Sequence, residues 1–129
     1  MESFRRAVVS KDPDAIVATL ADDVIFSSPI VFREYTGKIA VGFILRAVLA
    51  VLEDFHYVAD LRGGAHTALV FRARVGGKDL EGIDLIEATP TGLVARLTVF
   101  VRPLSGALAL KEAMGVALGA AGEKASAKP

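Results

Sequence analysis

Cysteine is missing from this sequence, and histidine occurs only twice, at His56 and His66. Without thiols the chain has neither a disulfide framework nor a thiolate nucleophile, and two imidazoles are too few to build a zinc site unaided. We therefore expect a protein that works without a metal ion or another cofactor.

An excess of charge of either sign is also missing, because 15 Lys and Arg residues balance 15 Asp and Glu residues. No basic cluster alternates with aromatic residues, which excludes the usual pattern of a nucleic-acid-binding protein. The most apolar stretch, residues 39–52, is shorter than the roughly 20 residues of a membrane span and contains Arg46. Residues 1–6 carry charges with no apolar run behind them, unlike a secretory signal, so we expect a cytoplasmic protein.

What the chain has in quantity is apolar residues, which make up 53% of its 129 residues. This length fits one compact domain with a core of its own. A composition this apolar must hide its surface in a core, a cavity or a partner interface. A dimer is therefore plausible from composition alone.

The first half of the sequence has helical patterning with one short strand. Phe4, Val8 and Val9 share a helical face, and Asp12 followed by Pro13 is typical of the start of a second helix, which we expect to end near residues 21–23. Residues 24–26 form a short β-branched and aromatic run, residues 35–37 predict a turn, and a long helix is expected from residue 38 or 39 to about 52.

The second half alternates with a period of two. Four strands are predicted at residues 55–61, 68–75, 80–88 and 93–102, separated by short Gly- or Pro-containing links. Such links favour antiparallel hairpins, and helices followed by a meander predict an α+β domain. Residues 104–118 have weak helical periodicity, so we assign residues 1–118 to the domain and residues 119–129 to a flexible tail.

Asp84 interrupts the third of these strands, and alternation leaves its direction open. In the second and fourth strands one face is clearly apolar; it consists of Leu69, Phe71, Ala73 and Val75, and of Ala95, Leu97, Val99 and Val101. In the third strand hydrophobicity alone slightly favours burying Ile83 and Leu85. Asp84 then either enters a dry cavity, where its pKa would rise, or points outward to Arg72, Arg96 or Arg102.

The order and spacing of several short segments resemble the nuclear transport factor 2-like superfamily. These are Asp12-Pro13-Asp14-Ala15-Ile16, the run from Ala21 to Pro29, Tyr35-Thr36-Gly37-Lys38, Gly82-Ile83-Asp84-Leu85-Ile86, Thr91-Gly92-Leu93-Val94 and the run from Val99 to Pro103. The resemblance implies a cone of three N-terminal helices on a curved antiparallel sheet, also known as cystatin-like. It further implies an apolar pocket and frequent dimerisation through the outer sheet surface. The superfamily includes ketosteroid isomerase, polyketide cyclases of the SnoaL type and non-enzymatic binding modules.

The resemblance to ketosteroid isomerase predicts which way the side chain of Asp84 points. The oxyanion aspartate of that enzyme falls on Asp84, which implies that Asp84 lies inside the pocket. Its catalytic base falls on Ser28 and its oxyanion tyrosine on Phe4. A serine without an adjacent base does not abstract a carbon-bound proton, and a phenyl ring donates no hydrogen bond, so we do not expect steroid isomerisation. Cyclases of the SnoaL type rely on one pocket aspartate, a role that Asp84 can fill alone.

The resemblance also implies a set of pocket residues beyond Asp84. The apolar members are Phe4, Phe26, Leu45, Leu69, Phe71, Leu97, Val99 and Val101. Three polar side chains complete the predicted ligand-binding set: Ser28, Tyr35 and His56. His56 could orient Asp84, and Tyr35 or Tyr57 could supply a phenol, although the commonest role of each such residue is structural.

Three functions remain open at this point. The first is binding of a small apolar molecule, with Asp84 as acid or base in an isomerase-like, cyclase-like or lyase-like reaction. The second is ligand binding without turnover, and the third is a protein-interaction module with a filled cavity. An inward Asp84 would leave Ile83 and Leu85 exposed, which favours a homodimer through the sheet surface.

Overall fold

The computed structural model describes the backbone of residues 2–126 and the side chains of residues 2–119. Along the chain the elements are α1 (Glu2–Val9), α2 (Pro13–Ala18), β1 (Leu20–Ser27), β2 (Glu34–Thr36), α3 (Lys38–Val51), β3 (Glu53–Gly63), β4 (His66–Val75), β5 (Lys78–Ala88), β6 (Val94–Arg102) and α4 (Leu104–Ser126). The predicted α+β class is confirmed, with three helices before the meander of long strands.

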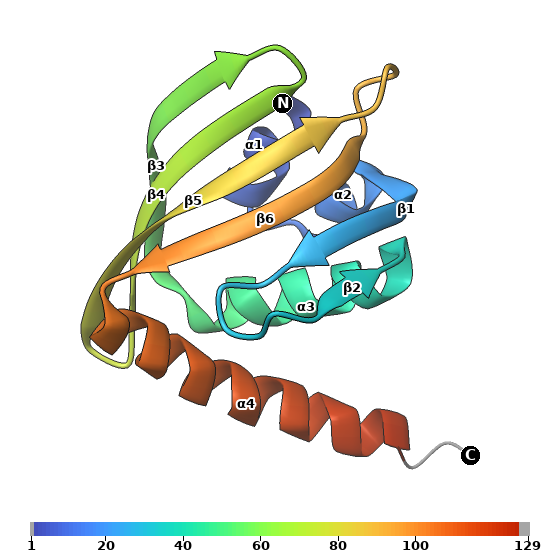
Figure 1. Ribbon diagram of the computed structural model, residues 1–129. Coiled ribbons are helices and arrows are strands. Elements are labelled where there is room, and N and C mark those ends of the chain that lie inside the picture. Colours follow the sequence, from blue (N-terminus) through green and yellow to red (C-terminus); the bar gives the residue numbers. More distant parts are fainter. Residues whose placement is uncertain (1, 127–129) are drawn as a thin grey trace.

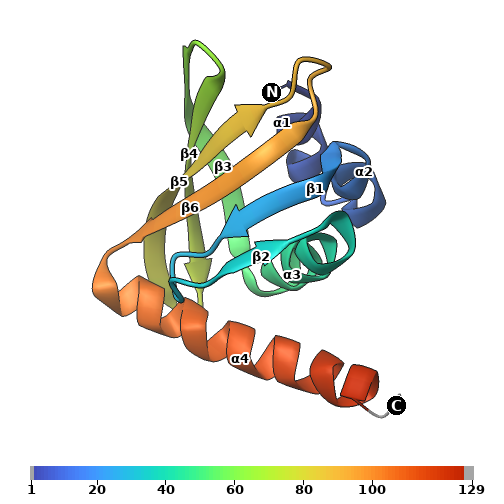
Figure 2. The same cartoon turned by 45° about the vertical axis from the view of Figure 1, so that its right-hand side comes forward.

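The six strands form one curved sheet in the order β2-β1-β6-β5-β4-β3. Neighbouring strands are antiparallel except β1 and β6, which run parallel. Figures 1 and 2 show α1, α2 and α3 gathered on the concave side of the sheet. This arrangement confirms the predicted packing of helices on a curved sheet, and it leaves a hollow between the sheet and α3.

The beginning of α2 follows the predicted signals, but its end does not. Asp12 Oδ1 accepts hydrogen bonds from the backbone N–H groups of Asp14 and Ala15, at 3.1 and 3.2 Å, and Pro13 occupies the first helical position. The helix ends at Ala18 instead of near residues 21–23, because Leu20 is completely buried and pairs with Val94 of β6. Pairing across the sheet thus overrides local helical pattern.

Two features of the sheet differ from the prediction made from alternation. Tyr35 belongs to strand β2 and pairs with Phe26, where a turn was expected. At the start of β6 the buried residue is Val94, with Ala95 only half-buried, because the register with β5 shifts between Glu87 and Ala88. A bulge of this kind moves side chains from one face to the other and is invisible to a period-two pattern.

Helix α4 continues through Ser126, beyond the domain boundary placed at residue 118. Residues 127–129 of the expected tail lie outside the described residues. Figure 2 shows α4 running across the lower end of the molecule, below α3. Within residues 104–119 of α4, Leu110 and Gly106 are buried, and Gly106 lies so close to β5 that an added Cβ would be 2.7 Å from Leu80 Cβ. None of the described helices combines the length and the apolar character of a membrane span.

Gly82 offers a test of how tightly the sheet packs below this hollow. A Cβ at this position would collide with the carbonyl oxygen of Phe100 and would stand 2.5 Å from Phe71 Cζ. Because both neighbours belong to the packed sheet, we expect Gly82→Ala to lower the free energy of unfolding by about 2–3 kcal/mol, measured by urea denaturation.

Gly63→Ala is the matched control, because Gly63 also lies in a strand and has no heavy atom within 4 Å of its added Cβ. This variant should change the free energy of unfolding by less than about 1 kcal/mol. Equal effects of the two substitutions would contradict the packing described here.

Candidate functional site

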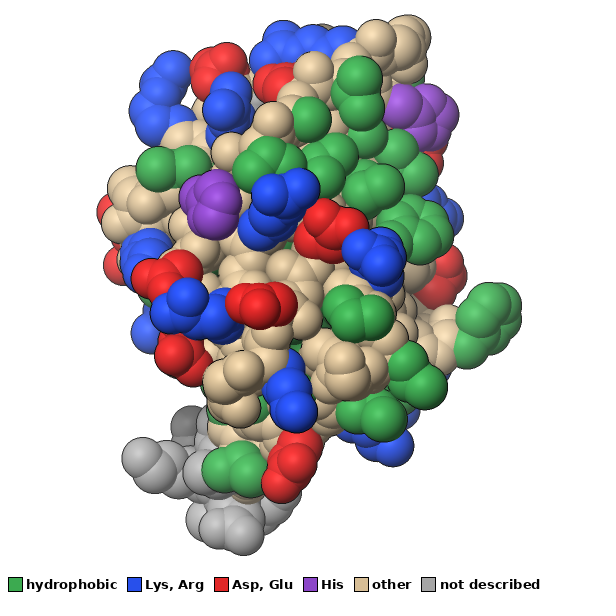
Figure 3. All heavy atoms as spheres, turned by 90° about the vertical axis from the view of Figure 1, so that its left-hand side faces the viewer, with side chains coloured by type: hydrophobic (Ala, Val, Ile, Leu, Met, Phe, Trp, Pro, Cys, Tyr) green, Lys and Arg blue, Asp and Glu red, His purple; other side chains and the backbone are tan. Residues whose placement is uncertain are grey.

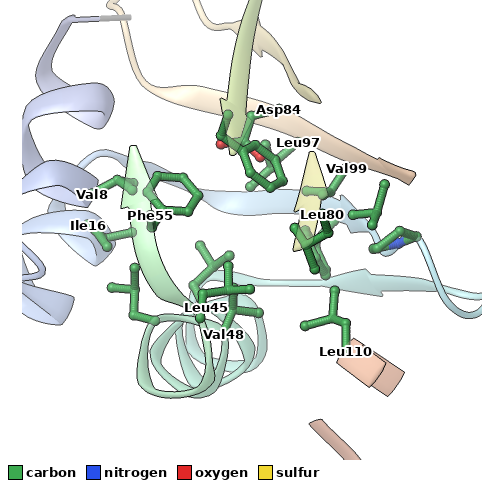
Figure 4. A pocket seen from close by; sticks show the side chains of 16 residues that line it. Val8, Ile16, Leu45, Val48, Phe55, Leu80, Asp84, Leu97, Val99 and Leu110 are labelled. Carbon is green, nitrogen blue, oxygen red and sulfur yellow. The ribbon is translucent and has the colours of Figure 1, made fainter. Parts of the chain in front are cut away.

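A small, partly enclosed cavity lies between the concave face of the sheet, α3 and α4. It encloses about 70 Å³, and among the side chains that line it Asp84 is the only one with a polar group. In Figure 4, Asp84, Leu97 and Val99 reach it from the sheet, Leu45 and Val48 from α3, and Leu110 from α4. Six of the predicted apolar residues do line this cavity: Phe26, Leu45, Phe71, Leu97, Val99 and Val101.

Strand β5 turns Asp84 inward together with Leu80, Gly82 and Ile86, so the direction implied by the family resemblance is the one observed. Asp84 is 8% exposed, whereas its neighbour Ile83 on the opposite face is 36% exposed. Alternation was ambiguous because the inward set includes a glycine and an acid. The glycine is needed because the ring of Phe71 fills the space beside it.

Tyr57 is the polar partner of Asp84. Its hydroxyl donates a hydrogen bond of 2.8 Å to Asp84 Oδ2, across the 27 residues that separate β3 from β5. The tyrosine ring packs edge-on against Phe55, with ring centroids 5.0 Å apart. Asp84 Oδ2 is therefore occupied by a fixed donor, and Oδ1 is the oxygen left for a ligand.

Burial controls the charge of this pair. Removal from water raises the pKa of Asp84 from 3.8 to about 7, and the hydrogen bond from Tyr57 works in the opposite direction. Burial, the nearby carboxylate and the same hydrogen bond raise the pKa of Tyr57 above its ordinary value of 10.0. The phenol thus stays protonated, while the carboxyl group exchanges its proton near neutral pH.

The other predicted site residues lie away from the cavity. Phe4 and Leu69 are completely buried in the core. Ser28 accepts hydrogen bonds from the N–H groups of Ile30 and Val31, both at 3.1 Å, and lines a surface groove instead. Tyr35 packs against Phe26. His56 is exposed on β3, with Nδ1 2.9 Å from the carbonyl oxygen of Asp54.

Ten residues of the site were missing from the predicted set. They are Tyr57 and nine residues that line the cavity: Val8, Ile16, Pro29, Val48, Leu49, Leu52, Phe55, Leu80 and Leu110. Tyr57 was considered as a source of a phenol, and Phe55 shares its face of β3, as their spacing of two residues indicates. Leu110 belongs to a segment whose helical periodicity is weak, so no sequence signal pointed to it. Among the side chains that the structure describes, no three His, Asp or Glu residues are grouped as metal ligands would be.

The raised pKa of Asp84 predicts a loss of stability as the pH rises. Between about pH 4 and pH 7 the unfolded chain ionises this carboxyl while the folded protein keeps it protonated. Folding should therefore weaken over this range by up to about 4 kcal/mol and stay at that lower level above pH 7. Asp84→Asn removes this dependence, so we expect the variant to be more stable than the native protein at pH 8 but not at pH 4, in urea denaturation across this range.

Asp79→Asn is the control, since Asp79 lies on the same strand with its side chain exposed. It should leave the difference between pH 4 and pH 8 unchanged. Tyr57→Phe removes the hydrogen bond that stabilises the carboxylate and so raises the pKa of Asp84 further. The decline of stability with pH should therefore continue above pH 7. A native pH dependence that Asp84→Asn leaves intact would show that Asp84 does not titrate as described.

Comparisons with known proteins agree with this architecture. The family model of the SnoaL-like domain matches residues 1–107. A steroid delta-isomerase from Pseudomonas aeruginosa is 36% identical, with a TM-score of 0.88 over 92% of this chain and 88% of its own. A protein with a cystatin-like fold from Silicibacter pomeroyi is 33% identical, with a TM-score of 0.85 over 89% and 82%.

More distant structures share the fold alone. A SnoaL-like protein from Burkholderia thailandensis is 23% identical, with a TM-score of 0.67 over 79% of this chain and 91% of its own. No curated protein matches the chain significantly. The family match ends within the first turn of α4, so most of that helix, including Leu110, lies beyond it.

Proposed function

This chain belongs to the SnoaL-like domain family, and on that basis we propose that it binds a small apolar carbonyl compound and moves a proton on it in an isomerase-type reaction. The observation that carries the proposal is Asp84, a protonatable carboxyl group in an otherwise apolar cavity, held by Tyr57. The steroid delta-isomerase at 36% identity supports a reaction of this type.

The binding step follows from the hydrogen bonds of the neutral carboxyl group. Because Tyr57 donates to Oδ2, the proton of neutral Asp84 resides on Oδ1 and can be donated to a ligand oxygen. A carbonyl group accepts such a hydrogen bond, and the surrounding apolar side chains favour a ligand that is apolar elsewhere. Binding should therefore be strongest below about pH 7.

The chemical step follows from the ionised form. A carboxylate with a pKa near 7 can accept a proton from the carbon next to a carbonyl group and return it. General bases work best when their pKa lies near the operating pH. The lining offers no second ionisable side chain, so Asp84 would have to perform both transfers. The cavity of about 70 Å³ is far smaller than the pockets of about 300–1,000 Å³ that hold drug-sized ligands, which argues against a whole steroid in it.

Ligand binding without turnover is the second candidate. The observation that favours it is the placement of Ser28 and Phe4, where the family comparison puts a base and a phenol. Ser28 is engaged in a turn and Phe4 is packed in the core. Asp84 would then be only the polar anchor of a bound molecule.

Hydrogen exchange on 2-butanone separates these candidates. In D2O the native protein should bind the ketone in ligand-detected NMR and speed up exchange of the hydrogens beside the carbonyl group, with a rate that rises through about pH 7 to a plateau as Asp84 ionises. Asp84→Asn should lower the accelerated exchange rate at least about 100-fold, in line with the contribution of general base catalysis. Asp79→Asn should behave like the native protein.

Binding without accelerated exchange would favour the second candidate. Exchange that persists in Asp84→Asn would remove Asp84 from the reaction. Absence of binding by the native protein would overturn the proposal altogether.

We also propose that two copies associate through the outer face of the sheet. There, two adjacent rows across β4, β5 and β6 are apolar or small, and a charged row borders them on each side. The inner rows are Val70-Ile83-Phe100 and Ala68-Leu85-Thr98, and the charged rows are Arg72-Glu81-Arg102 and His66-Glu87-Arg96. Figure 3 shows apolar side chains gathered between charged ones on this side of the molecule. An apolar centre with a polar rim is the usual anatomy of an interface.

Ile83→Asp tests this interface, because it places a charge at the centre of the apolar rows. We expect the native protein to sediment as a dimer and the variant as a monomer in analytical ultracentrifugation. Val9→Asp, on the exposed side of α1, should remain dimeric. A monomeric native protein would refute the proposed interface.

A further inference from the structure

The inner cavity shares part of its wall with a groove on the protein surface. The groove encloses about 840 Å³ and lies between the β1–β2 loop and the last residues of β6. Pro29, Val99 and Val101 line both the groove and the cavity. These side chains therefore form a partition between the two spaces.

The partition lies where β6 has a neighbouring strand on one side only. β1 pairs with β6 only as far as Ser27 and Thr98, whereas β6 continues to Arg102 with β5 as its remaining neighbour. Beside Val99 and Val101 the wall is thus closed by loop side chains instead of by a hydrogen-bonded strand. Side chains can move aside without breaking a β-ladder, so the wall can open at this place.

The loop that closes the wall is shaped by Ser28. Its hydroxyl accepts the N–H groups of Ile30 and Val31, which holds a tight turn after β1. The turn places Pro29 at the inner cavity and places Phe32 in the groove, where the phenyl ring is fully exposed. Phe100, half-exposed on β6, lines the same groove.

The charged residues of the groove are already engaged within the protein. Glu34 Oε2 accepts a hydrogen bond of 2.7 Å from Arg96 Nη1, and the guanidinium of Arg33 lies 4.9 Å from the ring centroid of Tyr35. What the groove offers to an occupant is therefore its apolar part. An uncharged hydrocarbon matches it better than an ionic group.

The two volumes complement each other as parts of one site. An engineered cavity of about 150 Å³ holds benzene, so the inner cavity admits a group of about three heavy atoms. The groove lies within the range of ordinary ligand sites. A ligand that reaches Asp84 with a compact end would have to leave the remainder of its length outside the partition.

We propose that the cavity and the groove form one two-part site for a linear molecule with a compact carbonyl head and an unbranched apolar chain. This inference rests on the proposed function, since the head is the carbonyl group that Asp84 holds. The chain passes between Pro29 and the free edge of β6 and lies against Phe32.

A series of 2-alkanones tests the two-part site. Dissociation constants are measured at pH 6 by NMR titration, from 2-butanone to 2-nonanone. For the native protein we expect each added methylene beyond the head to lower the constant about threefold to fourfold, as burial of hydrocarbon predicts. Phe32→Ala should raise the dissociation constant of 2-nonanone about tenfold and leave that of 2-butanone unchanged.

Phe43→Ala is the matched control, because Phe43 is an exposed phenylalanine on α3 and lies outside the groove. It should not alter the series, which excludes non-specific adsorption to exposed rings. Asp84→Asn should weaken the binding of every ketone in the series by a similar factor, because it changes only the contact with the carbonyl head.

The outcomes separate this inference from the proposed function. If 2-butanone binds in a manner that depends on Asp84 but longer ketones bind no tighter, the two-part site is wrong and the proposed function stands. If chain length matters equally in the native protein and in Phe32→Ala, the chain does not lie in the groove, and the inference is overturned. If no ketone binds, both fail.

Discussion

The site depends on the burial of one carboxyl group among hydrocarbon side chains. A carboxylate moved out of water without a counter-charge is costly, so the group keeps its proton up to about neutral pH. Tyr57 supplies one hydrogen bond but no positive charge, and none of the described residues that line the cavity is a lysine or an arginine. The pair is therefore poised between two protonation states, and this balance is lost if water or a cation gains access to Asp84.

Much of this arrangement could be predicted from the sequence, and the parts that could not have physical causes. The long helix α3 and the four strands of the meander could be predicted from the hydrophobic pattern, which is clearest in β4, where buried residues alternate regularly with more exposed ones. β2 was missed because its three residues contain no alternation long enough to read. The inward direction of Asp84 required the family comparison, since burying an acid contradicts the hydrophobic pattern that defines the other strands.

The site was harder to predict than the fold for a related reason. Apolar residues that line a cavity and apolar residues that fill a core have the same sequence pattern, so Phe4 and Leu69 were grouped with Phe71 and Leu97. Tyr57 becomes a partner of Asp84 only through the pairing of β3 with β4 and of β4 with β5. Contacts between strands that are 27 residues apart leave no local signal.

Ser28 shapes the loop that lies between the cavity and the surface groove. A serine at this position supplies no base, yet its hydroxyl fixes the turn that sets Pro29 against the cavity and Phe32 in the groove. A carboxylate could accept the same two N–H groups, but it would bring a charge to the partition between cavity and groove. The neutral hydroxyl keeps this partition apolar, so Asp84 is left as the one ionisable group of the cavity. The absence of a second acid and the apolar path to the surface thus have the same structural origin.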